Sequence, residues 1–245
     1  MKKNLGKLVI GCAMMLGLCG CETFDSAMIG DSVLTLIGSD SGGAELTLDT
    51  VVAGLKEALE VGTENAVDQV SDSGGYSANS LIRIPMPEQL EGMASALRKI
   101  GLDSSVDAFE ERMNRAAELA ADEAIPVFAD AITSMTFADA RGILDGGDTA
   151  ATDYFRDKTS AELASRYAPI VADEMETVQA VSLYNDLVGR YNKIPLVPKV
   201  ECNIEDYVTE KALDGLFTVL AQEEEKIREN PAARTTELLK TVFGK

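Results

Sequence analysis

Residues 106–120 have the sequence VDAFEERMNRAAELA, and their apolar positions recur at the three- and four-residue steps of an α-helix. Three of these positions are alanines, whose small side chains let a neighbouring helix approach closely. The stretch therefore predicts a helix that is buried along one face in a helical core. The positions assigned to that face are Val106, Phe109, Met113, Ala116, Ala117 and Ala120.

The same helical period continues on both sides of this stretch. Nowhere does an alternation of apolar and polar residues persist, and neither a repeat nor a domain boundary interrupts the pattern. We therefore predict an all-α fold, a single multi-helix domain over residues 47–245. About eight helices are expected, over residues 47–73, 87–101, 104–135 with a kink or a restart at Pro126, 136–144, 150–158, 159–191, 204–229 and 231–243.

Capping signals place several of the helix ends. Thr159 and Glu162 form the pattern of a capping box, which predicts that a new helix begins at this point. Pro169 is expected to interrupt that helix, because proline lacks the N–H that the helix needs. Asn203 is expected to cap the helix that follows.

Two segments with prolines break the helical period. Residues 81–87 read LIRIPMP and residues 194–198 read IPLVP. A proline disfavours helical geometry in the residue before it, so both segments are expected to be extended. We predict that they form two extended Pro-containing straps beside the helices.

The first 20 residues have the features of a signal for export. Three lysines precede an apolar run over residues 8–18, which is too short to span a membrane. The run ends in LCGC at residues 18–21, which resembles the lipobox of bacterial lipoprotein signals. That resemblance implies that residues 1–20 are removed as a lipoprotein signal peptide and that Cys21 is lipidated through its nucleophilic thiolate. The alternative is an ordinary signal peptide cut at a nearby glycine, with Cys21 incidental.

The segment that follows Cys21 predicts the location of the protein. Several acyl chains at this cysteine would give a stable membrane anchor. Glycine and serine dominate residues 38–43, so residues 21–46 are expected to be the lipidated cysteine and a flexible linker. Glu22 favours the outer membrane under the sorting rule of enterobacterial lipoproteins. We therefore expect a lipid-anchored protein of the cell envelope, on the periplasmic face of the outer membrane.

The charge of the chain limits its partners. It has 41 acidic and 22 basic residues, a formal net charge of −19. Such a surface repels the phosphates of nucleic acids, so no nucleic-acid partner is expected. The expected partners are the membrane, through the lipid at Cys21, and a protein of the envelope. The run EEEK at residues 223–226 is expected to be a solvated helix face.

No catalytic motif is found. The chain has no histidine, which removes the commonest general base and the commonest zinc ligand. Phosphate-binding loops, dinucleotide fingerprints and EF-hand patterns are also missing from the sequence. We therefore predict a protein that is not an enzyme and uses no cofactor and no metal. Residues 145–148, DGGD, could bind calcium, but a plain acidic loop is favoured because the ligand spacing is wrong.

Arg115 and Glu118 form the candidate ligand-binding site, together with Asn114 and with Arg83 from the first strap. Arg115 and Glu118 are spaced i and i+3, so they share a helical face beside the alanine-rich stripe. Arg115 with Arg83 could hold a carboxylate or a phosphate. The alternative, which we favour, is an ion pair that ties the strap to the helix, since a charge near an apolar stripe must be paired.

Seven stretches together resemble the domain of unknown function 4197 family of exported bacterial proteins. The resemblance covers about residues 47–244. It implies a helical secreted domain, often lipidated, with no assigned activity. The stretches are GLKEAL (54–59), IRIPMP (82–87), MNRAAE (113–118), AATDYF (150–155), KALDGLF (211–217), EEEKIR (223–228) and NPAAR (230–234).

Three functional hypotheses follow. The leading one is a non-enzymatic envelope lipoprotein that acts as a binding or assembly partner. The alternative is a carrier or sensor of a small anionic ligand held by Arg115 and Arg83. The third is a hydrolase that uses a pair of carboxylates, which is disfavoured because the chain has no tryptophan on which a sugar could stack.

Overall fold

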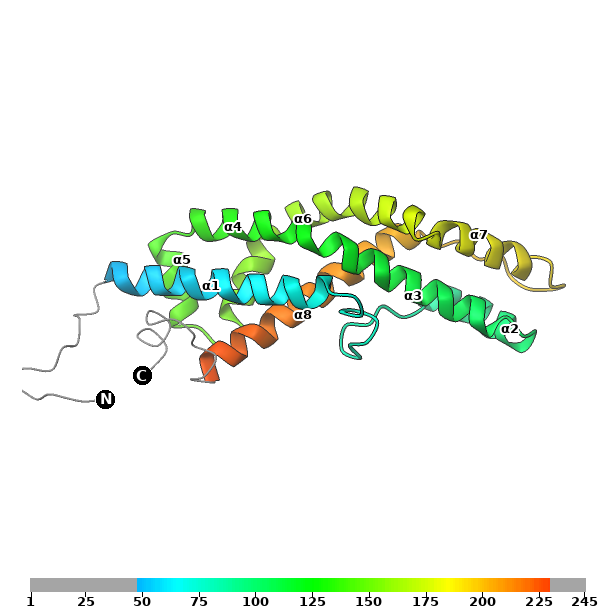
Figure 1. Cartoon of the computed structure of the whole chain (residues 1–245), viewed down its shortest axis with the longest axis horizontal. Coiled ribbons are helices and arrows are strands. Elements are labelled where there is room, and N and C mark those ends of the chain that lie inside the picture. The colour runs from blue at the N-terminus through cyan, green and yellow to red at the C-terminus, as the bar shows by residue number, and fades with distance from the viewer. Residues whose placement is uncertain (1–47, 230–245) are drawn as a thin grey trace, which may run out of the picture. The chain divides into compact units, whose positions relative to one another are not determined.

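The structure is a computed structural model that describes residues 48–229, all within the unit from Glu45 to Lys245. The residues described form eight α-helices and one 3₁₀ helix without any strand, so the domain is all-α, as predicted (Figure 1). The lipobox, the linker and the helix predicted over residues 231–243 lie outside the described residues. The elements are α1 (Leu48–Ser71), α2 (Glu88–Lys99), α3 (Asp103–Ala120), η1 (Ala121–Glu123), α4 (Ala124–Ser134), α5 (Phe137–Leu144), α6 (Ala150–Thr177), α7 (Ala180–Tyr191) and α8 (Ile204–Glu229).

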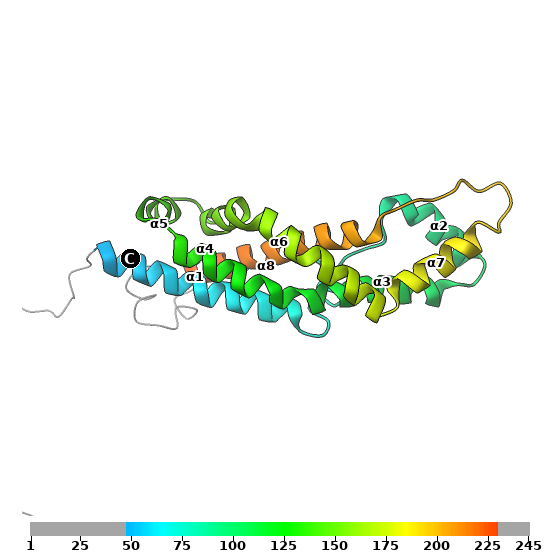
Figure 2. The same ribbon diagram turned by 90° about the horizontal axis from the view of Figure 1, so that it is seen from above.

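Helix α3 carries the stretch that predicts the fold, and all six of its predicted inward positions are fully buried. It contacts α1, α2, α6, α7 and α8, while α8 lies along α6 and α1 (Figures 1 and 2). The apolar faces of these helices form one main core cluster, whose burial supplies the main driving force for folding. Among residues 48–229, none of the helices has the length and apolar character to cross a membrane.

The helix start predicted at Thr159 is wrong. Helix α6 continues through this position, and the Thr159 hydroxyl donates to the carbonyl of Phe155 at 2.6 Å within the same helix. A threonine hydroxyl that donates to the carbonyl of residue i−4 is bonded inside the helix and does not cap a helix start. Pro169 also lies inside α6 without ending it. The break comes at Gln179, between α6 and α7, where φ is +58° in the left-handed region.

Other helix starts agree better with the sequence. Asn203 caps α8 as predicted, since its Oδ1 accepts the N–H of Asp206 at 3.2 Å. At α5, Thr136 and Asp139 form a reciprocal capping box. Pro126 is the third residue of α4, where an N–H would have no partner inside the helix, so the chain restarts here after η1.

The two segments predicted as straps differ from each other. In the connection between α1 and α2, residues 83–87 have no helix or turn, and Ile84 and Met86 are buried. The segment after α7 begins instead as a turn and becomes irregular from Val197. The second segment is not extended throughout because Leu196 has a φ of +67°, which lies in the left-handed region.

Candidate functional site

Asn114 fixes the connection between α1 and α2 to α3. Its buried Oδ1 accepts the N–H of Ile84 at 2.8 Å, and its Nδ2 donates to the carbonyl of Ile84 at 2.8 Å. The Nδ2 group also donates to the carbonyl of Glu110 at 2.7 Å. Ile84 has no strand neighbour that could pair its buried backbone groups. The Asn114 amide takes the place of that neighbour.

Glu118 binds the backbone of the residues that follow α1. Its side chain is only 2% exposed, and Oε1 accepts the backbone N–H groups of Gly74, Tyr76 and Ser77 at 3.1, 3.3 and 3.4 Å. The Ser77 hydroxyl donates to the same oxygen at 3.4 Å. The guanidinium of Arg115, whose side chain is 39% exposed, donates to Oε2 at 3.0 Å. We call these five residues the Glu118 clamp.

Arg83 does not join Arg115. Its guanidinium donates to the carboxylate of Glu110 at 3.0 Å, and the side chain is about half exposed. Arg115 and Arg112 line a surface hollow. The carboxylates of Glu111 and Glu118 also line this hollow, and Arg83 does not. The structure therefore places Arg115 and Glu118 in one hollow. Asn114 bonds instead to the backbone of Ile84, and Arg83 pairs with Glu110.

Tyr76 links the Glu118 clamp to α8. Its buried hydroxyl donates to the carbonyl of Ala212 at 2.6 Å. Burial raises the pKa of the Tyr76 phenol, and the nearby carboxylate of Glu118 raises it further. The close approach requires a glycine at position 215, because a Cβ there would lie 2.5 Å from Cε1 of Tyr76.

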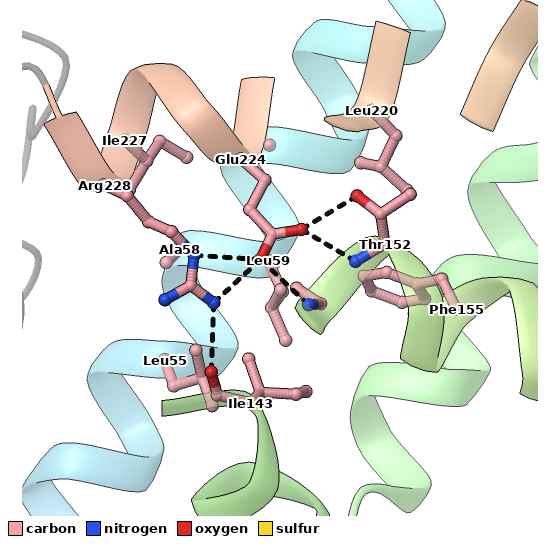
Figure 3. A pocket seen from close by; sticks show the side chains of 12 residues that line it. Leu55, Ala58, Leu59, Ile143, Thr152, Phe155, Leu220, Glu224, Ile227 and Arg228 are labelled. Carbon is pink, nitrogen blue, oxygen red and sulfur yellow. Dashed lines mark hydrogen bonds and ion pairs between the residues drawn. The ribbon is translucent and has the colours of Figure 1, made fainter. Parts of the chain in front are cut away.

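A second buried carboxylate, Glu224 of α8, holds the start of α6 (Figure 3). Its Oε1 accepts the N–H of Ala151 at 2.9 Å, and its Oε2 accepts both the N–H and the hydroxyl of Thr152 at 2.8 Å. Thr149, at the N-cap position of α6, makes no side-chain cap bond. Glu224 therefore caps α6 from another helix, where a negative charge is also favoured by the helix dipole.

Arg228, one turn after Glu224, completes this arrangement. Its Nε and Nη2 donate to Glu224 Oε1 at 2.9 and 2.7 Å, and Nη2 also donates to the carbonyl of Ile143 at 3.0 Å (Figure 3). That carbonyl belongs to the last turn of α5, where it lacks a helical partner. The ion pair of Glu224 and Arg228 thus caps both the end of α5 and the start of α6. We call Glu224, Arg228, Ala151, Thr152 and Ile143 the Glu224 clamp.

A small apolar cavity lies beside the Glu224 clamp, between α1, α5, α6 and α8 (Figure 3). Its volume of about 30 Å³ is enough for one or two water molecules and too small for a metabolite. Leu55, Leu59, Gly62, Leu220 and Ile227 form most of its apolar lining. The cavity is therefore a packing defect near the clamp.

The prediction of a solvated face over residues 223–226 is wrong for half of the run. Glu223 and Glu224 are each only 8% exposed, while Glu225 and Lys226 are exposed. The sequence reasoning missed Glu224 because its donors lie more than 70 residues away along the chain. One signal could have found it. The stretches 150–155 and 223–228 both carry the family resemblance, and together they contain four of the five clamp residues.

The two buried glutamates use their acceptor positions to different extents. An ionised carboxylate offers about four acceptor positions. Five hydrogen bonds reach Glu224 and are spread over both oxygens, so its acceptor positions are filled. Five also reach Glu118, but four of them fall on Oε1, and Oε2 accepts only from Arg115. In the acidic loop, Asp145 pairs with Arg141 at 3.3 Å. Among residues 48–229, no group of three His, Cys, Asp or Glu side chains is arranged to hold a metal ion.

A family model described as "Protein of unknown function (DUF4197)" matches residues 45–244. No curated protein and no solved structure matches the chain.

Proposed function

Because the chain belongs to this family of proteins of unknown function, we propose its role from its own residues: a lipid-anchored protein of the bacterial envelope that acts without catalysis. Its helical domain serves as a binding or assembly partner for another envelope protein. The lipobox-like end of the signal at Cys21 supports the anchor, and Glu22 supports the location on the periplasmic face of the outer membrane. The absence of histidine from the sequence supports a role without catalysis.

One structural observation carries the non-catalytic part of the proposal. The buried polar side chains of Asn114, Glu118 and Glu224 all bond to backbone groups of other segments. Their hydrogen-bonding capacity is used to join helices and connections, which is the typical role of buried polar groups in a scaffold. The carboxylate hydrolase hypothesis would need two acids that are open to a substrate, and Glu224 is filled by donors of its own chain.

The anchor is tested by mass spectrometry of the protein made in a bacterium that processes lipoproteins. We expect the mature chain to begin at Cys21 and to carry acyl chains, and Cys21→Ser to remove them. The matched control is Cys202→Ser, which replaces the half-buried free cysteine of the domain and should leave acylation unchanged. A mature chain without acyl groups would overturn the anchor.

The partner is tested by crosslinking in intact cells. We expect one envelope protein to be recovered with the wild type, and to be lost when exposed side chains of the helical domain are replaced. Recovery of a monomer alone, under conditions that capture a known envelope complex, would contradict the binding role.

The anion-carrier hypothesis is second because only part of its site is assembled. Arg112 and Arg115 line one hollow with the hydroxyls of Ser73 and Ser77, but Arg83 is elsewhere. If phosphate or acetate binds there, it should raise the melting temperature of the wild type and have no effect on Arg115→Met. Arg83→Met is the matched control and should keep the response. A wild type that neither anion stabilises would leave Arg115 with its structural role alone.

A further inference from the structure

The hollow beside Arg115 lies where three parts of the chain meet. Helix α3 lines it together with the residues that follow α1 and with the end of α6, and Ala108 and Val178 add an apolar part to its lining. Its volume of about 360 Å³ is within the range of sites that bind small molecules. We call it the α3 hollow, after the four charged residues of α3 that line it: Glu111, Arg112, Arg115 and Glu118.

Two of these four charges have no partner of opposite sign within residues 48–229. Arg112 donates Nη1 to the carbonyl of Gln179 at 2.9 Å and forms no ion pair with any described residue. Glu111 is exposed, and its carboxylate makes neither a hydrogen bond nor an ion pair in the same residues. Neighbours in the sequence do not face each other on a helix, so Glu111 and Arg112 line one hollow without pairing.

The other two charges, Arg115 and Glu118, use only part of their hydrogen-bonding capacity. Arg115 donates Nη1 to Oε2 of Glu118 at 3.0 Å, and its Nε and Nη2 make no hydrogen bond within the described part of the chain. Each oxygen of a carboxylate has about two acceptor positions. The Oε2 atom of this buried side chain therefore keeps one position for a further donor, and an acceptor left unfilled in a buried group costs free energy.

The α3 hollow has no net charge, and its rim is slightly acidic. Two arginines balance two glutamates inside it. Among the acids within two residues of the lining, Asp107 and Glu110 pair with Arg98, whereas Asp72 and Glu176 are exposed and unpaired within residues 48–229. A ligand with negative charge alone is repelled by this rim, and a ligand with both signs of charge is not.

We propose that the α3 hollow binds a small zwitterion that carries the ammonium and the carboxylate of an α-amino acid. Arg112 and Arg115 bind the carboxylate, for which guanidinium groups are well suited. The ammonium group donates to Oε2 of Glu118 and to Glu111. The proposal rests on the anion-carrier hypothesis, because its carboxylate is the anion of that hypothesis, and it adds the positive charge that defines the class of ligand.

Alanine, propionate and ethylamine separate the two charges of the ligand. Propionate is alanine without the ammonium group, and ethylamine is alanine without the carboxylate. In calorimetric titrations of the full chain, we expect alanine to bind about tenfold or more tightly than either of the other two, since each charged group adds charge-assisted hydrogen bonds.

Two variants test the two halves of the site. Glu111→Gln should weaken the binding of alanine by about twofold to fivefold, as expected for an exposed ion pair, and leave that of propionate unchanged. Arg112→Met should weaken both ligands by about tenfold or more. Glu225→Gln, on the exposed face of α8, is the matched control and should change neither. A residue with a structural role alone would not separate alanine from propionate.

Three outcomes would overturn the proposal. Alanine that binds no more tightly than propionate would remove the zwitterion and leave the anion-carrier hypothesis standing. If neither ligand binds, both proposals fail, and the charges of the α3 hollow serve the fold alone. If alanine binds tightly but Glu111→Gln and Arg112→Met leave its affinity unchanged, with melting temperatures that show both variants to be folded, the ligand occupies another site.

Discussion

The Glu118 clamp and the Glu224 clamp use the same residue types for different tasks. In each, a buried glutamate accepts backbone N–H groups from a distant segment and pairs with an arginine on its own helix. Glu118 organises a connection and concentrates its long-range donors on one oxygen, and its arginine is 39% exposed. Glu224 caps a helix and receives N–H donors on both oxygens, and its arginine is only 15% exposed.

This difference determines how much each clamp depends on charge. At Glu118, one oxygen satisfies the backbone and the other faces a half-solvated arginine, so a neutral amide could replace the carboxylate in part. At Glu224, both oxygens must accept, and the arginine is too buried to be solvated when the pair is broken. Two sites with the same composition should therefore respond differently to the same substitution.

The largest expected effect is that of Glu224→Gln. The new NH₂ group must face an N–H donor of α6 or the guanidinium of Arg228, whose charge then lacks its carboxylate. We expect a loss of about 3–5 kcal/mol in the free energy of unfolding, measured with urea. Glu225→Gln, on the exposed side of the same turn, is the control and should change the stability by less than about 0.5 kcal/mol. Equal effects of the two substitutions would contradict the role of Glu224 as a cap.

Glu118→Gln should cost less. The amide oxygen can keep the three N–H donors of residues 74–77, while its NH₂ group faces Arg115, which water can partly solvate. We expect a loss of about 1–3 kcal/mol by the same measurement. A loss as large as that of Glu224→Gln would show that the exposure of the arginine does not distinguish the two clamps.

Two glycines provide a test of opposite sign. Gly215→Ala would place a Cβ 2.5 Å from Cε1 of Tyr76 and 3.2 Å from Cβ of Ile82, and should destabilise the domain by about 1–2 kcal/mol after the gain in helix propensity. Gly62→Ala, beside the cavity at the Glu224 clamp, would place its Cβ 3.5 Å from Cδ1 of Ile227, an ordinary contact. It should stabilise α1 by about 0.5–1 kcal/mol. Thermal unfolding of both variants checks the two signs.

The smallest effect concerns the start of α5, the helix whose last turn is held by Arg228. Hydrogen bonds from the Thr136 side chain and backbone hold the pKa of Asp139 below its usual range. A lowered pKa stabilises the folded state above the unfolded pKa of about 3.9, and this contribution is lost as the pH falls through the folded pKa. Asp139→Asn should therefore be less stable than the wild type at neutral pH, with a gap that closes in acid. A gap that stays constant down to acid pH would rule out the linkage.

The fold could be predicted in large part because its signals are local. The inward face of α3 and the cap at Asn203 follow from residues within one or two turns of each other. Local patterns failed where a buried contact had the deciding role. Thr159 has the spacing of a helix start, but its hydroxyl bonds within α6, and Pro169 is tolerated in the same helix because tertiary packing outweighs one missing hydrogen bond.

The sequence by itself determined the helical class, the burial of α3 and the pairing of Arg115 with Glu118, which is a contact across one helical turn. Only the tertiary structure decided that Glu118 holds the connection after α1, that Arg83 pairs with Glu110, and that Glu224 caps α6. The physical reason is the range of the interactions. Helical periodicity repeats within four residues, whereas the donors of a buried carboxylate are chosen by the packing of helices that lie far apart in the chain.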